Sequence, residues 1–230
     1  MKTLNNILKS IRSTTGSSLA EFATVSALMA TLAATAAPKL SEMSEGTKGE
    51  KSGKEIDKIL TQAGNFYQAT ADTEGRGRFP GQEKYNVAVG GYGGELLIAD
   101  GNMQNAMDAT TALSAVYTKL ETFNSYEDDA SDWCSVFGTD YAAYPSGANV
   151  SDDAYEACDD CSTSDPAAGL TGAEEFVQLF NGNALNSKFQ DGHFIYVVVP
   201  GGGSGTGSFP PVIVVADLEN PSDFNNSLEP

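Results

Sequence analysis

GSSLAEFATVSALMATLAATAAP, residues 16–38, is the stretch that decides how this chain is organised. A short segment precedes it in which Lys2, Lys9 and Arg12 stand without any acidic residue. Because cytoplasmic flanks of membrane segments accumulate lysine and arginine, this layout predicts an N-terminus that stays inside while the apolar run enters a bilayer. Glu21 is the one acidic residue of the run, and a carboxylate facing lipid costs about 2.5 kcal/mol or more on insertion scales. Glu21 therefore needs a reason to be there.

The segment resembles the prepilin signature of the type IV pilin and pseudopilin family. In that family a prepilin peptidase cuts after a glycine, the new N-terminal amine is methylated, and the fifth mature residue is glutamate. The resemblance implies cleavage after Gly16, methylation of Ser17, and assembly roles for Glu21 and Phe22. Pro38 falls where common pilins carry a helix-loosening proline, which removes one backbone hydrogen bond. The resemblance also implies that a neighbouring subunit's amino terminus neutralises Glu21, and such a buried pair sets register more than it adds stability.

Three subfamilies fit this signature. Ser17 replaces the usual phenylalanine, and the run is rich in alanine and threonine, so membrane retention should be weaker than is usual for the family. The GSSLAEF start is also similar to pseudopilins of the tight-adherence system. The turn GRGRFPG, residues 75–81, resembles the turn that closes the first helix in major pseudopilins of type II secretion. A surface pilus subunit, a type II secretion pseudopilin and a tight-adherence pseudopilin all remain open.

The resemblance has consequences for location and partners. It implies a precursor in the inner membrane that meets prepilin peptidase, and then a periplasmic or extracellular filament of identical or related pilin subunits. The rival interpretation is an ordinary secretory signal, cut near Ala36 or Ala37, that releases a soluble acidic binding protein. Glu21 inside the apolar core and Pro38 just behind the scissile bond argue against that rival.

The rest of the chain predicts one globular head. We expect a leader over 1–16, a hydrophobic membrane or filament-core helix with a polar glycine-containing stretch over 17–54, and the head over 55–230. Apolar residues recur at helical spacing from Glu55 to about Ala71, so an amphipathic helix is expected there. The glycines of the preceding stretch each cost about 1 kcal/mol relative to alanine, which predicts a bend or frayed segment. These glycines are Gly46, Gly49 and Gly53.

Within the head the patterns predict an α+β fold, in which the long N-terminal helix packs on an antiparallel sheet with extra helices and an acidic loop. Two uniformly apolar strands, 193–200 and 210–218, should lie centrally against the long helix. A hairpin is expected from 85–89 and 95–99, and a helix over 104–123. The capping box that begins at Thr171 predicts a third helix to about Phe180.

Charge and composition exclude some classes of function. The formal net charge is -18, and from Tyr85 to the end Lys119 and Lys188 are the only basic residues against 22 acidic ones. Such a surface repels phosphate backbones, so nucleic acid is excluded as a partner. The chain has one histidine and lacks a GxSxG elbow, so an enzyme is not expected. No cofactor is required for an assembly role.

The head carries two further candidate sites. A disulfide between Cys134 and Cys158 or Cys161 would close a loop of about 25 residues and contribute roughly 3 kcal/mol. A zinc site would need all three cysteines and His193, and a redox pair is disfavoured because the two acids between Cys158 and Cys161 raise the thiol pKa. For calcium, the candidate ligands after the last strand are Asp217, Glu219 and Asp223.

Overall fold

The computed structural model describes residues 2–90, 106–123, 133–138, 172–189, 193–203 and 205–230; over 2–20 and 106–108 it describes the backbone alone. Helix α1, Lys2–Glu74, is continuous and contains Pro38. The chain divides into two compact units, Met1–Thr47 and Lys48–Pro230, which are described separately below. The second unit begins earlier than the predicted head at residue 55, because Gly49 and Ser52 of α1 are already buried in it.

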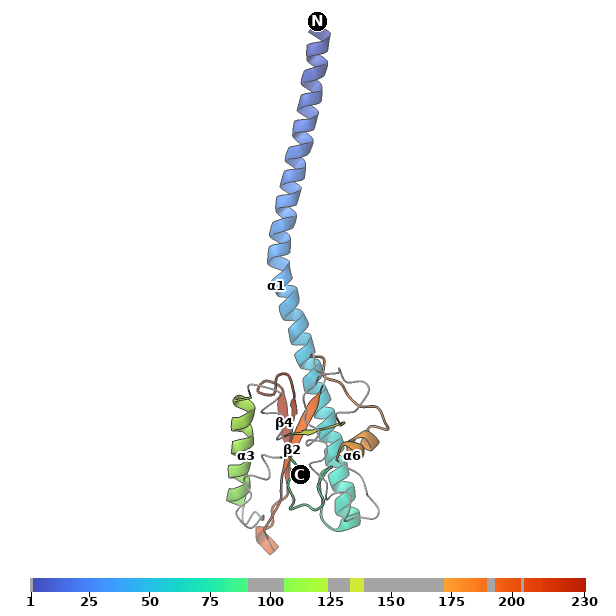
Figure 1. The fold of residues 1–230 in the computed structure, drawn as a ribbon, viewed down its shortest axis with the longest axis vertical. Helices are drawn as coiled ribbons and strands as arrows, with labels where there is room; N and C mark the ends of the chain where they lie inside the picture. Colours follow the sequence, from blue (N-terminus) through green and yellow to red (C-terminus); the bar gives the residue numbers. More distant parts are fainter. Residues whose placement is uncertain (1, 91–105, 124–132, 139–171, 190–192, 204) are drawn as a thin grey trace. The chain divides into compact units, whose positions relative to one another are not determined.

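The second unit is built on a four-stranded antiparallel sheet in the order β1-β2-β3-β4 (Figure 1). The strands are β1 (Cys134–Ser135), β2 (Phe194–Val199), β3 (Val212–Asp217) and β4 (Asn225–Leu228). The pair β2 and β3 runs in full register, from Phe194 opposite Asp217 to Val199 opposite Val212. The two predicted apolar strands are therefore confirmed as the central pair.

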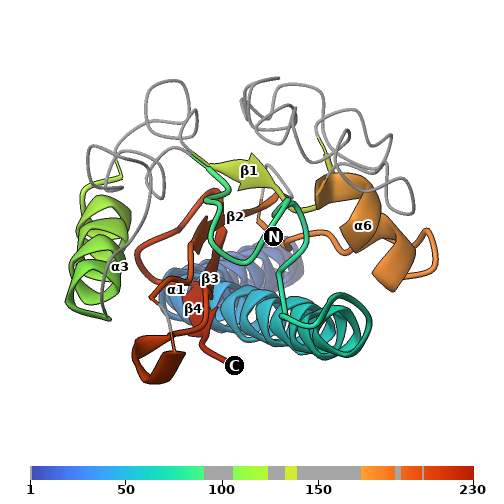
Figure 2. The same cartoon turned by 90° about the horizontal axis from the view of Figure 1, so that it is seen from below.

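Helices cover both faces of this central pair (Figures 1 and 2). Because side chains alternate along a strand, one set from β2 and β3 packs on α1 and the other on α3, Ala106–Glu121. The set facing α1 is Phe194, Tyr196, Val198, Ile213 and Val215. The set facing α3 is Ile195, Val197, Val199, Val212, Val214 and Ala216. Burial on both faces explains why these strands are apolar throughout.

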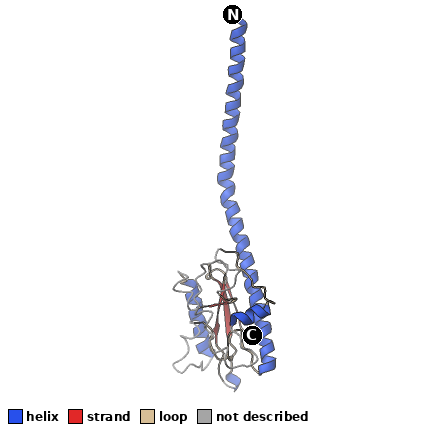
Figure 3. Cartoon of the chain, turned by 45° about the vertical axis from the view of Figure 1, so that its right-hand side comes forward, coloured by secondary structure: helices blue, strands red, loops and turns tan. Residues whose placement is uncertain are grey.

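The contributions of the helices agree with the predicted periodicity. Ile56, Ile59, Leu60 and Ala63 of α1 are buried against the sheet, and so are Ala112, Val116 and Leu120 of α3. The third helix, α6, spans Gly172–Leu179; the predicted cap Thr171 lies outside the described residues. These elements confirm the α+β architecture, a long N-terminal helix on an antiparallel sheet with extra helices (Figure 3).

The helix is not frayed at the glycines of α1, so that part of the prediction is wrong. The helix runs through all three, and Gly49 is buried. A β-carbon at Gly49 would lie 2.6 Å from Cζ of Phe224, whose ring stacks on Phe189 with centroids 5.2 Å apart. Gly49 thus lets an aromatic pair approach the helix, and this packing compensates for its low helix propensity.

The predicted strand over 85–89 is also wrong. Only Val89 forms a bridge, to Val198 of β2, and the expected partner strand 95–99 lies outside the described residues. The backbone instead turns around the side chain of Gln82. Its Nε2 donates to Val87 O at 2.6 Å and Tyr85 O at 3.3 Å, and its Oε1 accepts from Phe79 N at 2.8 Å. A side chain therefore satisfies the backbone groups that a strand ladder would otherwise pair.

One close approach joins three distant parts of the unit. The hydroxyl of Tyr196 in β2 donates to Pro80 O at 3.3 Å and lies against Gly81 and Gly172. A β-carbon at either glycine would overlap the tyrosine oxygen, and Gly81 also has φ of 87°. The turn after α1, the start of α6 and the central strand meet at this point.

Candidate functional site

The apolar part of α1 has the composition of a membrane-crossing helix. Among the described residues, one helix near the N-terminus is long and apolar enough to cross a membrane, and none of its apolar stretch is buried. A secretory signal sequence has the same length and composition. Large apolar side chains of this segment are 48–73% exposed: Phe22, Val25, Leu28, Met29, Leu32, Leu40 and Met43.

These seven side chains form a single stripe. At about 100° per residue, all of them fall within an arc of about 120° on the helix. We call this set the apolar stripe. The opposite side of the helix carries small residues: Ala23, Ala27, Ala30, Thr31, Ala34 and Ala37. The segment is therefore two-faced by size, with large side chains on one side and alanine and threonine on the other.

The threonines of this segment satisfy their hydroxyls within the helix. Thr24 Oγ1 donates to Glu21 O at 2.9 Å, Thr31 Oγ1 to Ala27 O at 3.1 Å, and Thr35 Oγ1 to Thr31 O at 3.0 Å. Such back-bonding gives each hydroxyl a partner within the helix, which makes it compatible with apolar surroundings.

The predicted assembly residues lie on this segment. Glu21 and Phe22 are exposed, and Glu21 lies within the arc of the apolar stripe. Pro38 is inside the unbroken helix. Gly16 and Ser17 lie in α1, where the backbone alone is described, so cleavage between them stays a prediction.

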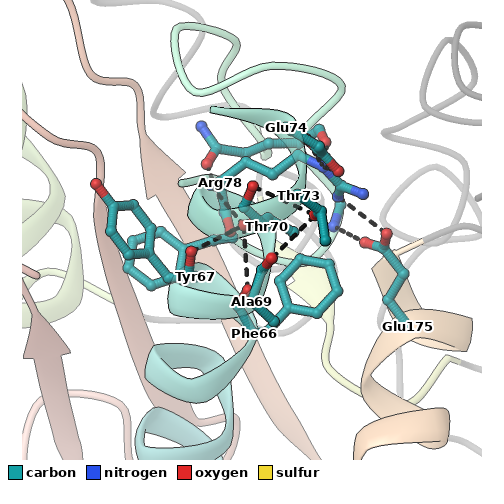
Figure 4. Close-up of polar contacts among 11 residues, drawn as sticks. Phe66, Tyr67, Ala69, Thr70, Thr73, Glu74, Arg78 and Glu175 are labelled. Carbon is teal, nitrogen blue, oxygen red and sulfur yellow. Dashed lines mark hydrogen bonds and ion pairs between the residues drawn. The ribbon is translucent and has the colours of Figure 1, made fainter. Parts of the chain in front are cut away.

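A second polar arrangement fixes the turn after α1 (Figure 4). Arg78 is buried, and its Nε donates to both Glu74 carboxylate oxygens at 3.1 and 3.2 Å. Its Nη1 donates to Glu175 Oε1 at 2.9 Å and to Gln82 O at 3.1 Å. The Thr70 hydroxyl closes the turn, because it accepts from Arg78 N at 3.1 Å and donates to Arg78 O at 3.2 Å.

Glu175 joins α6 to this arrangement. It is 5% exposed, and its Oε2 accepts from Gly81 N at 2.7 Å. Burial raises the pKa of the Glu175 carboxyl above its ordinary value, while Arg78 and the Gly81 N–H oppose that rise. The group is an anchor that holds the 75–81 turn against α6. The sequence identified the turn but gave no signal for the pairing, since Arg78 and Glu175 are 97 positions apart.

The three residues of the calcium prediction are placed differently from one another. Asp217 is buried, Glu219 is half-buried and Asp223 is exposed. Within the described residues, no three histidine, cysteine or acidic side chains gather as a metal-binding group. Calcium binding stays a prediction.

Asp217 faces two buried serines. Ser187 Oγ donates to Asp217 Oδ2 at 2.5 Å and lies 3.3 Å from Ser52 Oγ of α1, and Glu219 N donates to Asp217 Oδ1 at 3.1 Å. Burial raises the pKa of Asp217, although the hydrogen bonds from Ser187, Glu219 and Ser52 oppose the rise. This hydroxyl chain ties the end of β3 to α1.

Cys134 lies in β1 as a buried free thiol, and burial raises its pKa to about 12. The thiolate is therefore disfavoured at neutral pH. The structure forms no disulfide at Cys134. Its predicted partners, Cys158 and Cys161, lie outside the described residues, so the pairing and the alternative zinc set with His193 stay predictions.

No family model, curated protein or solved structure matches this chain.

Proposed function

We propose that this chain is a structural subunit of a type IV pilus-like filament. It is made as a precursor anchored in the inner membrane, cut after Gly16 by prepilin peptidase, and assembled with identical or related subunits through the N-terminal part of α1. The observation that carries the proposal is the exposed apolar stripe with Glu21 set inside it.

Energetics supports an assembly role for the stripe. Burying a large apolar side chain contributes about 1.5–3 kcal/mol, so burial of the seven exposed ones would contribute on the order of 10 kcal/mol. Contiguous exposed apolar surface marks contact with a partner or a membrane. A filament supplies the partner and the precursor supplies the membrane. A soluble product cut near Ala36 would contact neither a filament nor a membrane, yet Leu40 and Met43 would remain exposed on it.

A pseudopilin of a type II secretion system is the second candidate. The feature that favours it is the 75–81 turn, whose sequence resembles the turn of major pseudopilins. Arg78 and Glu175 hold this turn in the packed structure of the head. Finding the filament at the cell surface would favour the pilus, and confinement to the periplasm would favour the pseudopilin.

The first test is the N-terminus of the mature protein. We expect mass spectrometry of the chain isolated from the cells that produce it to find a methylated Ser17. A mature chain that begins at Ala37 or Pro38 would end the proposal, because the apolar stripe would be lost up to that point.

The second test is Glu21→Ala. We expect cleavage after Gly16 to persist and filaments to be lost, because the carboxylate that pairs with a neighbour is gone. Glu45→Ala is the matched control, since Glu45 is exposed on the side of the helix away from the stripe. Filaments of normal yield from Glu21→Ala would contradict the role given to Glu21.

A further inference from the structure

Three glycines lie within eight residues of α1: Gly46, Gly49 and Gly53. Proline apart, glycine has the lowest helix propensity, so the segment 46–53 is intrinsically a weak part of this helix. Packing accounts for Gly49, whose missing side chain leaves room for the ring of Phe224. It does not account for the other two, because a β-carbon at Gly46 or Gly53 would meet nothing within 4 Å. The helix is nevertheless continuous here, and two contacts with the rest of the second unit support it.

An aromatic pair makes the first contact. The ring of Phe224 lies against Gly49 and stacks on Phe189, with ring centroids 5.2 Å apart and an interplanar angle of 30°. Gly49 is buried, whereas every residue of α1 from 21 to 48 is exposed or half-buried. Gly49 is therefore the first residue of α1, from position 21 onward, that the fold encloses.

A chain of hydroxyls makes the second contact, about one helical turn further on. Ser52 is buried, and its Oγ lies 3.3 Å from Ser187 Oγ. The Ser187 hydroxyl donates its one hydrogen to Asp217, so Ser52 is the donor toward Ser187. Ser187 Oγ also accepts from Phe189 N at 3.1 Å. Residues 187–189 thus take part in both contacts and join them.

We propose that residues 46–53 of α1 form a hinge, and that the two contacts act together as a clasp that keeps the hinge helical. The clasp consists of Gly49, Ser52, Ser187, Phe189, Asp217 and Phe224. When the clasp opens, the glycines allow the hinge residues to leave the helix. They span about 12 Å as a helix and up to about 26 Å when extended, so opening lengthens and loosens the connection between the two units. The hinge does not depend on filament formation.

The burial of the clasp favours local opening over unfolding of the whole unit. Phe189 and Phe224 are half-buried. The central strands β2 and β3 are buried at every position and are covered on both faces. Regions with few buried contacts open at a lower free energy than the core does. We therefore expect the clasp to open while the sheet stays folded.

Hydrogen exchange of the full chain in detergent, read by mass spectrometry, tests the hinge. In Phe224→Ala we expect the protection factors of amides 47–53 to fall about 30-fold, with those of β2 and β3 unchanged. Ser187→Ala breaks the hydroxyl chain without altering α1, and it should lower the protection of the same amides about tenfold. Phe209→Ala is the matched control, because Phe209 is half-buried against the α3 side of the sheet and its loss should leave amides 47–53 unchanged.

A rescue experiment tests the part played by the glycines. Gly46→Ala with Gly53→Ala, added to Phe224→Ala, should restore protection about tenfold or more, because alanine favours the helix and both β-carbons have open space. Unchanged protection in either Phe224→Ala or Ser187→Ala would overturn the clasp. A loss of protection at β2 and β3 equal to that at 47–53 would overturn the hinge, since the unit would then open as a whole. Failure of the two alanines to restore protection would overturn the role given to the glycines.

Discussion

Replacing Arg78 with methionine tests the anchor between the 75–81 turn and α6. Methionine keeps much of the apolar stem of arginine but removes the guanidinium that contacts Glu74, Glu175 and Gln82. Glu175, 5% exposed, is left with the Gly81 N–H as its remaining partner among those described above. Breaking a buried ion pair by removing one member costs about 3–5 kcal/mol, so we expect a loss of this size at pH 8.

The loss should depend on pH in a defined direction. The pKa of Glu175 is raised in the folded state. A carboxyl with such a raised folded-state pKa contributes stability at pH values below its unfolded-state pKa, and this contribution is lost as pH rises through the folded-state pKa. Without Arg78, the effect of burial on the Glu175 pKa is opposed less, so this pKa rises further in the variant. Protonation of Glu175 at lower pH then removes the unpaired buried charge and restores part of the lost stability. We expect the difference from the unaltered chain to be largest near pH 8 and to shrink toward pH 5.

The assay can use the full chain because Trp133 is the one tryptophan and is fully buried in the head. Its fluorescence during urea unfolding, at fixed detergent concentration, reports the free energy of unfolding of the second unit. In a Glu175→Gln background the pH dependence of the Arg78→Met loss should disappear.

Lys54→Met is the matched control, because its pair with Glu50 is 3.9 Å long with both side chains more than 70% exposed, and it should change stability by less than about 0.5 kcal/mol. A loss from Arg78→Met below about 1 kcal/mol, or one independent of pH, would refute the reasoning.

Two further outcomes are expected from the same unfolding assay. Gly53→Ala should raise the free energy of unfolding by up to about 1 kcal/mol through helix propensity, because a β-carbon there meets nothing within 4 Å. Gly49→Ala should instead lower it, because the new carbon meets the Phe224 ring. Equal gains at both sites would contradict that packing. Asp217→Asn should flatten the fall in stability as pH rises from 5 to 8, because the pKa of this buried carboxyl is raised and its favourable contribution is lost over rising pH; an unchanged profile would contradict the role given to Asp217.

The long helices and the central strands could be predicted from the sequence. Apolar residues at helical spacing, from Ile56 to Ala63 and from Ala112 to Leu120, identified the two helices that cover the sheet, and the continuous apolar runs identified β2 and β3. These signals are strong because burial acts on every residue of a long element.

Elements fixed by single tertiary contacts were missed. The strand β4, Asn225–Leu228, is polar and half-buried, and β1 is two residues long, so neither shows a period that a sequence can reveal. The packing at Gly49 could not be predicted, because the ring that needs its empty space comes from Phe224, far along the chain. Gln82 likewise replaces a strand ladder by contacts that depend on one side chain. Local patterns do not contain information of this kind.

The meeting of Tyr196 with Gly81 and Gly172 constrains how this protein can diverge. Neither glycine can acquire a side chain while the phenol remains, and shortening the phenol would leave a hollow that nothing nearby fills. In descendants of a common ancestor the three positions should change together or not at all. Covariation of these three positions would identify distant homologues whose sequences are otherwise too different to align.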